Sequence, residues 1–80
     1  MWRIDYSPEV RSFLLDNGNL VADLITSIRS LRFTEGLPDI GALEVEPSYY
    51  YWLTEGYIVA YRRIEAEQLC RIISIKPDSY

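Results

Sequence analysis

Residues 49–76 read YYYWLTEGYIVAYRRIEAEQLCRIISIK, and this stretch decides the fold class. It consists of three runs rich in aromatic and β-branched residues, each separated from the next by a short polar segment. Such composition favours strands joined by tight turns. We expect strands at Tyr49–Leu53, Tyr57–Ile64 and Gln68–Lys76, with turns at 54–56 and 65–67. Two successive hairpins of this kind predict an antiparallel meander.

Upstream of the meander, the chain begins with a strand and a helix. Residues 2–6 alternate large apolar with charged side chains, which is typical of a half-buried strand. Ser7 then suits a helix N-cap, Pro8 the first helical position, and Glu9 the positive end of the helix dipole. The segment 16–18, Asp-Asn-Gly, indicates the end of this helix.

A second helix is predicted after Asn19, which can cap it. Its apolar side chains recur with helical spacing at Leu20, Val21, Leu24, Ile25, Ile28 and Leu31. Residues 33–47 contain two glycines and two prolines and predict a loop, with a short strand at Leu43–Glu46. The expected fold class is therefore α+β with the order β-α-α-β-β-β. A helical hairpin would pack on a mainly antiparallel sheet.

Length and composition favour one domain spanning residues 1–80. Hydrophobic residues make up 49% of the 80 residues, enough to build a core. No apolar run approaches the length of a membrane span. Cys70 is the single cysteine and has no partner for an internal disulfide. We expect a soluble, cytoplasmic domain that does not associate with membranes.

The net charge and the lack of histidine limit the ligands and reactions that we expect for this chain. Eight basic and twelve acidic residues give a net charge of −4, which disfavours direct nucleic-acid binding as the main interaction. The chain has no histidine, so an imidazole base and a histidine metal site are excluded. We expect neither a metal nor a cofactor.

Four short segments of the sequence, taken together, resemble those of a known protein family. The first helix opens with Tyr6-Ser7-Pro8-Glu9-Val10, and the second ends with Ile28-Arg29-Ser30-Leu31. Residues 56–62 read GYIVAYR, and residues 72–76 read IISIK. In this order the segments resemble the RelE/ParE superfamily of bacterial toxins, whose corresponding strand reads Gly-Tyr-Arg-x-x-Tyr. The resemblance implies a RelE/ParE-like fold and a toxin–antitoxin role. Such toxins cut messenger RNA on the ribosome or, in the ParE branch, poison DNA gyrase, and a protein antitoxin neutralises them.

The basic residues of RelE-type ribonucleases are not matched. The positions that resemble two strand lysines hold Tyr50 and Trp52, and the arginine position after Gly-Tyr holds Ile58. Residues 77–78, Pro-Asp, stand where a further arginine is expected. The resemblance therefore implies a member without the standard cationic site for phosphate chemistry. Whether the chain is an enzyme stays open, with the balance against it; if it is one, it is an endoribonuclease.

Two sets of candidate site residues follow. Tyr50 and Trp52 share a strand face, and with Ile58 they could form an exposed aromatic partner-binding patch. Alternatively, the tyrosines are ordinary amphipathic strand residues. Three of the eight basic residues, Arg62, Arg71 and Lys76, together with Tyr80, are candidates for a rearranged catalytic site. Adjacent Arg62 and Arg63 should point to opposite faces, and the favoured interpretation of these arginines with Arg71 is an exposed cross-strand ion-pair ladder. The alternative is a small basic cluster with Lys76 that contacts RNA or an acidic antitoxin segment.

Four functions remain open. The first is a growth-inhibiting toxin that acts on translation or gyrase and is neutralised by a protein antitoxin. The second is a degenerate, non-enzymatic protein-binding module. The third is a ribosome-dependent mRNA endonuclease with a rearranged site. The fourth is an unrelated α+β domain that forms a homodimer through the aromatic face.

Overall fold

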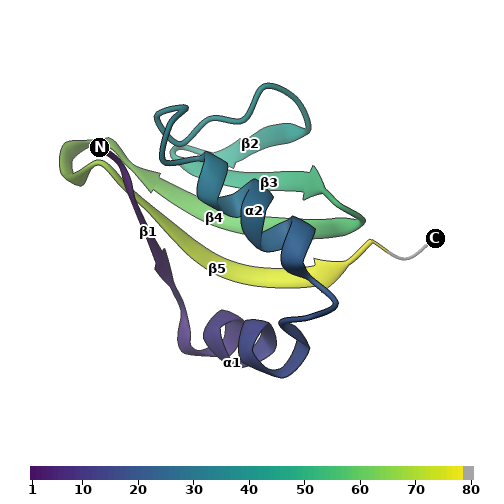
Figure 1. Cartoon of the computed structure of the whole chain (residues 1–80). Coiled ribbons are helices and arrows are strands. Elements are labelled where there is room, and N and C mark those ends of the chain that lie inside the picture. Colours follow the sequence, from purple (N-terminus) through teal and green to yellow (C-terminus); the bar gives the residue numbers. More distant parts are fainter. Residues whose placement is uncertain (79–80) are drawn as a thin grey trace.

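The structure is a computed structural model that describes residues 1–78. Its elements follow one another in the order strand, two helices and four strands (Figure 1). They are β1 (Arg3–Tyr6), α1 (Pro8–Asn17), α2 (Ala22–Ser30), β2 (Ala42–Glu46), β3 (Tyr49–Thr54), β4 (Tyr57–Ile64), a 3₁₀ turn (Glu65–Glu67) and β5 (Leu69–Pro77). The α+β class is confirmed, and the predicted strand boundaries of the meander lie within one residue of those observed.

One five-stranded sheet has the order β1-β5-β4-β3-β2. The pairs β3–β4 and β4–β5 are antiparallel, as the meander predicted. β2 also pairs with β3 in antiparallel fashion, and β1 joins β5 in parallel. The parallel pair is possible because α1, α2 and three strands supply the long crossover that parallel neighbours require. The first and last strands of the chain therefore lie side by side, with β1 and β2 at the two edges.

Figure 1 shows α2 lying across one face of the sheet, whereas α1 lies beside β5, beyond the end of β1. Ser7 fixes the start of α1. Its hydroxyl oxygen accepts a hydrogen bond from the Val10 amide at 3.2 Å and donates one to the Ile73 carbonyl at 3.0 Å. A bulge in the pairing of β4 with β5 leaves Ile73 without a partner on β4, so its carbonyl is available to Ser7. The predicted cap thus also attaches the helix to the sheet.

The second helix begins later than predicted. The amides of Leu20 and Val21 both bond to the Asn17 carbonyl, which makes a turn of residues 17–21. Asn19 therefore does not cap α2, and Leu20 is 83% exposed instead of lying in the core. Those two expectations were wrong because the helical spacing of the apolar residues continues through a turn that the periodicity alone does not reveal.

The core lies between α2 and the sheet and is centred on Tyr61. This ring is fully buried, stacks on Tyr50 at 5.2 Å between centroids, and donates its hydroxyl to the Gly36 carbonyl at 2.7 Å. Gly36 adopts φ +78°, and a Cβ there would lie 2.8 Å from the Cys70 sulfur. Only glycine combines this φ with so close an approach. The turn after α2 is thereby docked on the sheet.

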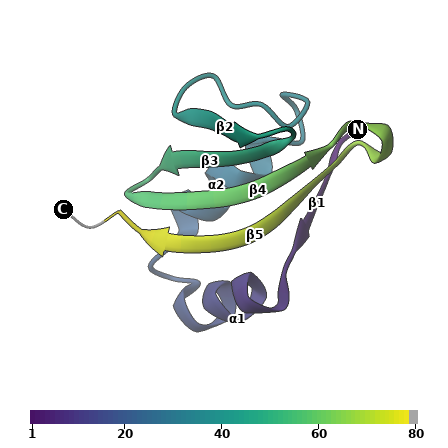
Figure 2. The same cartoon turned by 180° about the vertical axis from the view of Figure 1, so that it is seen from behind.

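The opposite face of the sheet is open. Figure 2, from behind, shows the strands in front of α2, with no helix of the described residues covering them. Between residues 1 and 78, no helix has the length and apolar character needed to cross a membrane.

Candidate functional site

The structure corrects the expected aromatic patch. Trp52 is only 4% exposed, and it lies opposite fully buried Val59 on the face that packs against α2. Tyr50 is half-buried on the same face, stacked on Tyr61. Ile58 pairs with Leu53 and therefore points to the open face. The expectation that Tyr50, Trp52 and Ile58 share one exposed patch was wrong. Alternation identifies which side chains share a face but not which face the helices cover.

An apolar strip does occupy the open face, with different members. We define the apolar strip as Leu43, Tyr51, Leu53 and Ile58. Leu43 pairs with Tyr51, and Leu53, which is 51% exposed, pairs with Ile58, which is 37% exposed. A hollow of about 240 Å³ lies against these residues beside Asp78. The strip is the largest set of exposed apolar side chains that the register places together on this face.

A charged row crosses the other end of the same face. Successive pairings join Asp5, Arg71, Arg62, Tyr49 and Glu46 across all five strands. The Nε of Arg71 lies 3.4 Å from the Asp5 carboxylate, and the Arg62 guanidinium lies 5.1 Å from the centre of the Tyr49 ring. Two directly opposed arginines repel each other, so these neighbours offset an unfavourable pair. Both cations are engaged with their neighbours in the row.

The candidate catalytic residues are only partly brought together. Arg62 and Arg71 are cross-strand partners, but Lys76 pairs with Ile58 beside the apolar strip. The Ala60–Ser74 pair lies between Lys76 and the arginines. Tyr80 lies outside the described residues. The structure thus places Arg62 with Arg71 and separates Lys76 from both.

Arg63 points to the helix side, opposite to Arg62 as predicted, and its side chain is 15% exposed. Its Nε donates to the Glu35 carbonyl at 2.7 Å, and its guanidinium lies 4.7 Å from the centre of the Trp2 ring. An ion pair to Glu65 at 3.4 Å completes its contacts. These interactions hold the turn after α2 against β4, so Arg63 is a structural residue.

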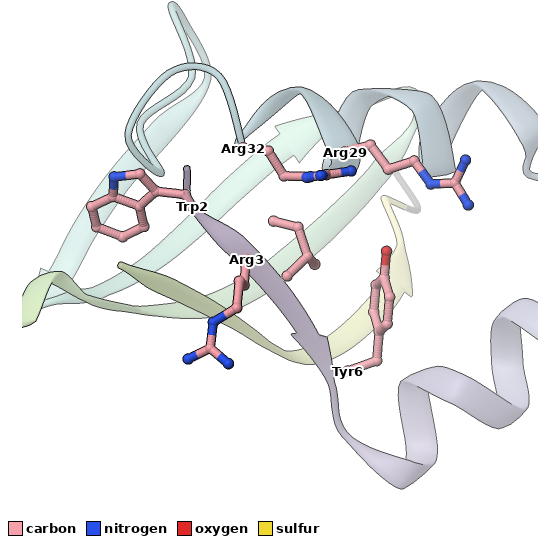
Figure 3. A pocket seen from close by; sticks show the side chains of 6 residues that line it. Trp2, Arg3, Tyr6, Arg29 and Arg32 are labelled. Carbon is pink, nitrogen blue, oxygen red and sulfur yellow. The ribbon is translucent and has the colours of Figure 1, made fainter. Parts of the chain in front are cut away.

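A basic cleft lies on the helix side, at the free edge of β1 (Figure 3). Its volume is about 400 Å³, and its lining residues come from β1, α2 and the residues flanking them. They are Trp2, Arg3, Ile4, Tyr6, Arg29 and Arg32. We call this the arginine cleft. Figure 3 shows the Tyr6 hydroxyl pointing from β1 toward α2, while the Arg3 side chain extends from β1 away from α2.

The residues that line the arginine cleft include positive charges and no negative ones. Three of its six lining residues are arginines and none is acidic. Within residues 1–78, the ion pairs of the structure involve Arg63 and Arg71, not these three. Burial raises the pKa of Tyr6, and Arg29 and Arg32 act in the opposite direction. Because Arg3 alternates with Ile4 on β1 and shares the open face with Asp5, its side chain points away from α2. At neutral pH the helix side of the cleft therefore presents the two guanidinium groups of Arg29 and Arg32 and a neutral phenol, all hydrogen-bond donors.

Sequence analysis did not identify this cleft. The sequence placed Arg29 only in the motif that ends the second helix, and Arg3 in the alternating segment 2–6. The available signal was the spacing of Arg29 and Arg32, three positions apart at the end of α2 and in the turn that follows, without an acidic residue between them. Their proximity to Arg3 depends on tertiary packing.

Nucleophilic and metal chemistry find little support in the described residues. Cys70 is fully buried, and burial raises the pKa of its thiol to about 11, so the reactive thiolate is suppressed at neutral pH. No group of three acidic or cysteine side chains within residues 1–78 is placed to hold a metal ion. Two surfaces of the described residues are suited to binding. The apolar strip offers apolar contacts, and the arginine cleft offers guanidinium groups.

Comparison with known proteins assigns no family, because no family model, no curated protein and no solved structure matches this chain.

Proposed function

We propose that this protein is a toxin-like component of a bacterial toxin–antitoxin pair that inhibits growth through translation or DNA gyrase. A protein antitoxin neutralises it. The order of strand, two helices and antiparallel meander supports the proposal, because it is the order that the RelE/ParE resemblance implies. Because β1 pairs in parallel with β5, the first strand and the meander form one continuous sheet.

The proposed activity does not use the standard RelE ribonuclease site. Residues that act together on one RNA must share a sheet face. On this sheet, the β3 residues that share a face with Ile58 are Tyr49, Tyr51 and Leu53, each one position away from a residue first compared with the lysines. None of these four residues carries a charge at neutral pH. The cationic groups that would stabilise a scissile phosphate are therefore missing from both sets of positions.

The apolar strip is the observation that carries the proposal. Contiguous exposed apolar side chains on a small domain mark protein contacts, because burying them against a partner is favourable. The strip occupies the open sheet face, where antitoxin docking would cover it. Its charged neighbours, Lys76 on one side and the charged row beyond, would supply the polar rim typical of an interface.

Induced expression in a bacterial host tests the proposal. The chain should arrest growth when expressed alone, and whichever of protein or DNA synthesis stops first separates ribosome from gyrase. Co-expression with the product of a neighbouring small gene should restore growth. Soluble, folded chain without growth arrest would contradict a toxin. Cleaved messenger RNA would instead establish the endonuclease alternative.

Paired variants test the role of the apolar strip. Leu53→Ser with Ile58→Ser removes two strip side chains and should abolish relief by the antitoxin. Leu15→Ser with Leu20→Ser is the matched control, since both leucines are exposed outside the strip. Equal relief of both double variants would show that the strip is not the docking surface.

The same observation favours a second candidate, a non-enzymatic binding module or homodimer that uses the strip. Sedimentation analysis of the purified chain distinguishes the homodimer. A dimer that dissociates in the Leu53→Ser, Ile58→Ser variant but not in the matched control would support it, whereas a monomer at all concentrations would exclude it.

A further inference from the structure

The free edge of β1 offers backbone groups to an added strand. The amides of Arg3 and Ser7 donate to the Gln68 and Ile72 carbonyls of the β5 side. In a parallel pair, the residues that bond to the neighbour alternate along the strand, so Arg3, Asp5 and Ser7 face β5. The backbone groups of Ile4 and Tyr6 consequently point away from β5, toward the edge. No strand of the described residues lies on that side.

The arginine cleft lies along this same edge. Ile4 and Tyr6 line it from β1, and Arg29 and Arg32 line it from the end of α2 and the turn that follows. Arg3 also borders the cleft, but its side chain extends from β1 away from α2 (Figure 3). An extended ligand that carries negative charges on one face could therefore engage Arg29 and Arg32 together.

We propose that the arginine cleft binds an extended acidic segment of a partner protein, which adds as a strand to the free edge of β1. Main-chain hydrogen bonds to Ile4 and Tyr6 hold the segment. Carboxylates at alternate positions, all on one face of the added strand, meet Arg29 and Arg32. The phenol of Tyr6 donates a further hydrogen bond to the same face. This binding does not depend on the growth-inhibiting role, and it uses a different surface from the apolar strip.

Two other occupants fit less well. A nucleic acid could use the guanidinium groups but not the strand edge, and the net charge of −4 disfavours its approach. A second copy of this chain, paired through β1, would bring together the arginines of two clefts, and the side chains that β1 places on the helix side include no acidic group. The combination of strand edge and basic rim is complementary to an acidic peptide.

Titration with synthetic peptides tests the proposal on the full chain. A short peptide alternating glutamate and valine should bind, and one alternating lysine and valine should not. Arg29→Gln with Arg32→Gln should weaken binding of the acidic peptide at least about tenfold. Arg11→Gln, an exposed arginine of α1 outside the cleft, is the matched control and should bind as the parent does. All three substituted side chains are polar and exposed, and thermal unfolding checks that the variants fold.

Backbone methylation of the peptide separates strand addition from charge attraction alone. In an added strand, every second amide would donate a hydrogen bond to β1. Methylation of these amides should abolish binding, whereas methylation of the intervening amides, which point away from β1, should not. Equal binding of both methylated peptides would overturn strand addition. Equal binding by the Arg29→Gln, Arg32→Gln variant would overturn the cleft as the site. Arginine-dependent binding of a single-stranded oligonucleotide, without binding of the peptide, would overturn the proposal in favour of nucleic acid.

Discussion

Replacing Tyr61 by phenylalanine removes one oxygen atom from the centre of the fold. The Tyr61 hydroxyl donates to the Gly36 carbonyl at 2.7 Å, and both residues are buried. Phenylalanine keeps the ring that stacks on Tyr50 but leaves this carbonyl without its donor. A buried polar group that loses its partner costs about 1–3 kcal/mol. For a domain of this length, a loss of about 2 kcal/mol lowers the melting temperature by roughly 8–16 °C.

Urea unfolding followed by tryptophan fluorescence measures this loss, because Trp2 and Trp52 are both buried. The midpoint should fall while the dependence on urea stays the same, since the surface exposed on unfolding does not change. Tyr51→Phe is the control: Tyr51 lies on the open face, and its replacement should change stability by less than about 0.5 kcal/mol. If Tyr61→Phe is no more destabilising than Tyr51→Phe, the hydroxyl does not hold the turn and the account of the core is wrong.

Two further predictions concern the same region. Gly36→Ala should destabilise the fold by at least about 1–2 kcal/mol, because alanine disfavours φ +78° and its Cβ would lie 2.8 Å from the Cys70 sulfur. In urea unfolding, combining it with Cys70→Ala should relieve part of this loss. Additive effects of the two substitutions would argue against the contact. Burial raises the pKa of Cys70 to about 11, whereas the thiol of the unfolded chain ionises near about 8.5. Between these values the unfolded chain releases a proton that the folded chain retains, so stability should fall as pH rises through this window. Unfolding of Cys70→Ala across pH 8–10.5 should show a shallower decline, and identical slopes would refute the assignment.

The sequence predicted the meander well because its signals are local. The segment around Gly56 combines turn residues with flanking aromatic and branched residues, and β3 and β4 begin where expected. The cap at Ser7 was also predictable, since serine, proline and glutamate act within one helical turn.

The failures concern information carried by distant parts of the chain. Tyr50 and Trp52 lie on a strand with apolar residues on both faces, so the pattern does not specify which face is covered. That choice depends on α2 and on the turn at Gly36, which approaches Cys70 from 34 positions away in the sequence. The arginine cleft likewise requires β1 to pair with β5 near the end of α2, and no local pattern connects Tyr6 with Arg29.

The parallel pairing of β1 with β5 also bears on how the chain folds during its synthesis. The hydroxyl of Ser7 and the Ile73 carbonyl that it contacts are 66 positions apart, so β1 leaves the ribosome well before β5, the strand with which it pairs. At a translation rate of about 5–20 residues per second, β1 and α1 wait for several seconds without it. Contacts of such long range slow the folding of small domains. We expect the antiparallel hairpins to form first and the N-terminal strand to join them as the final step of assembly.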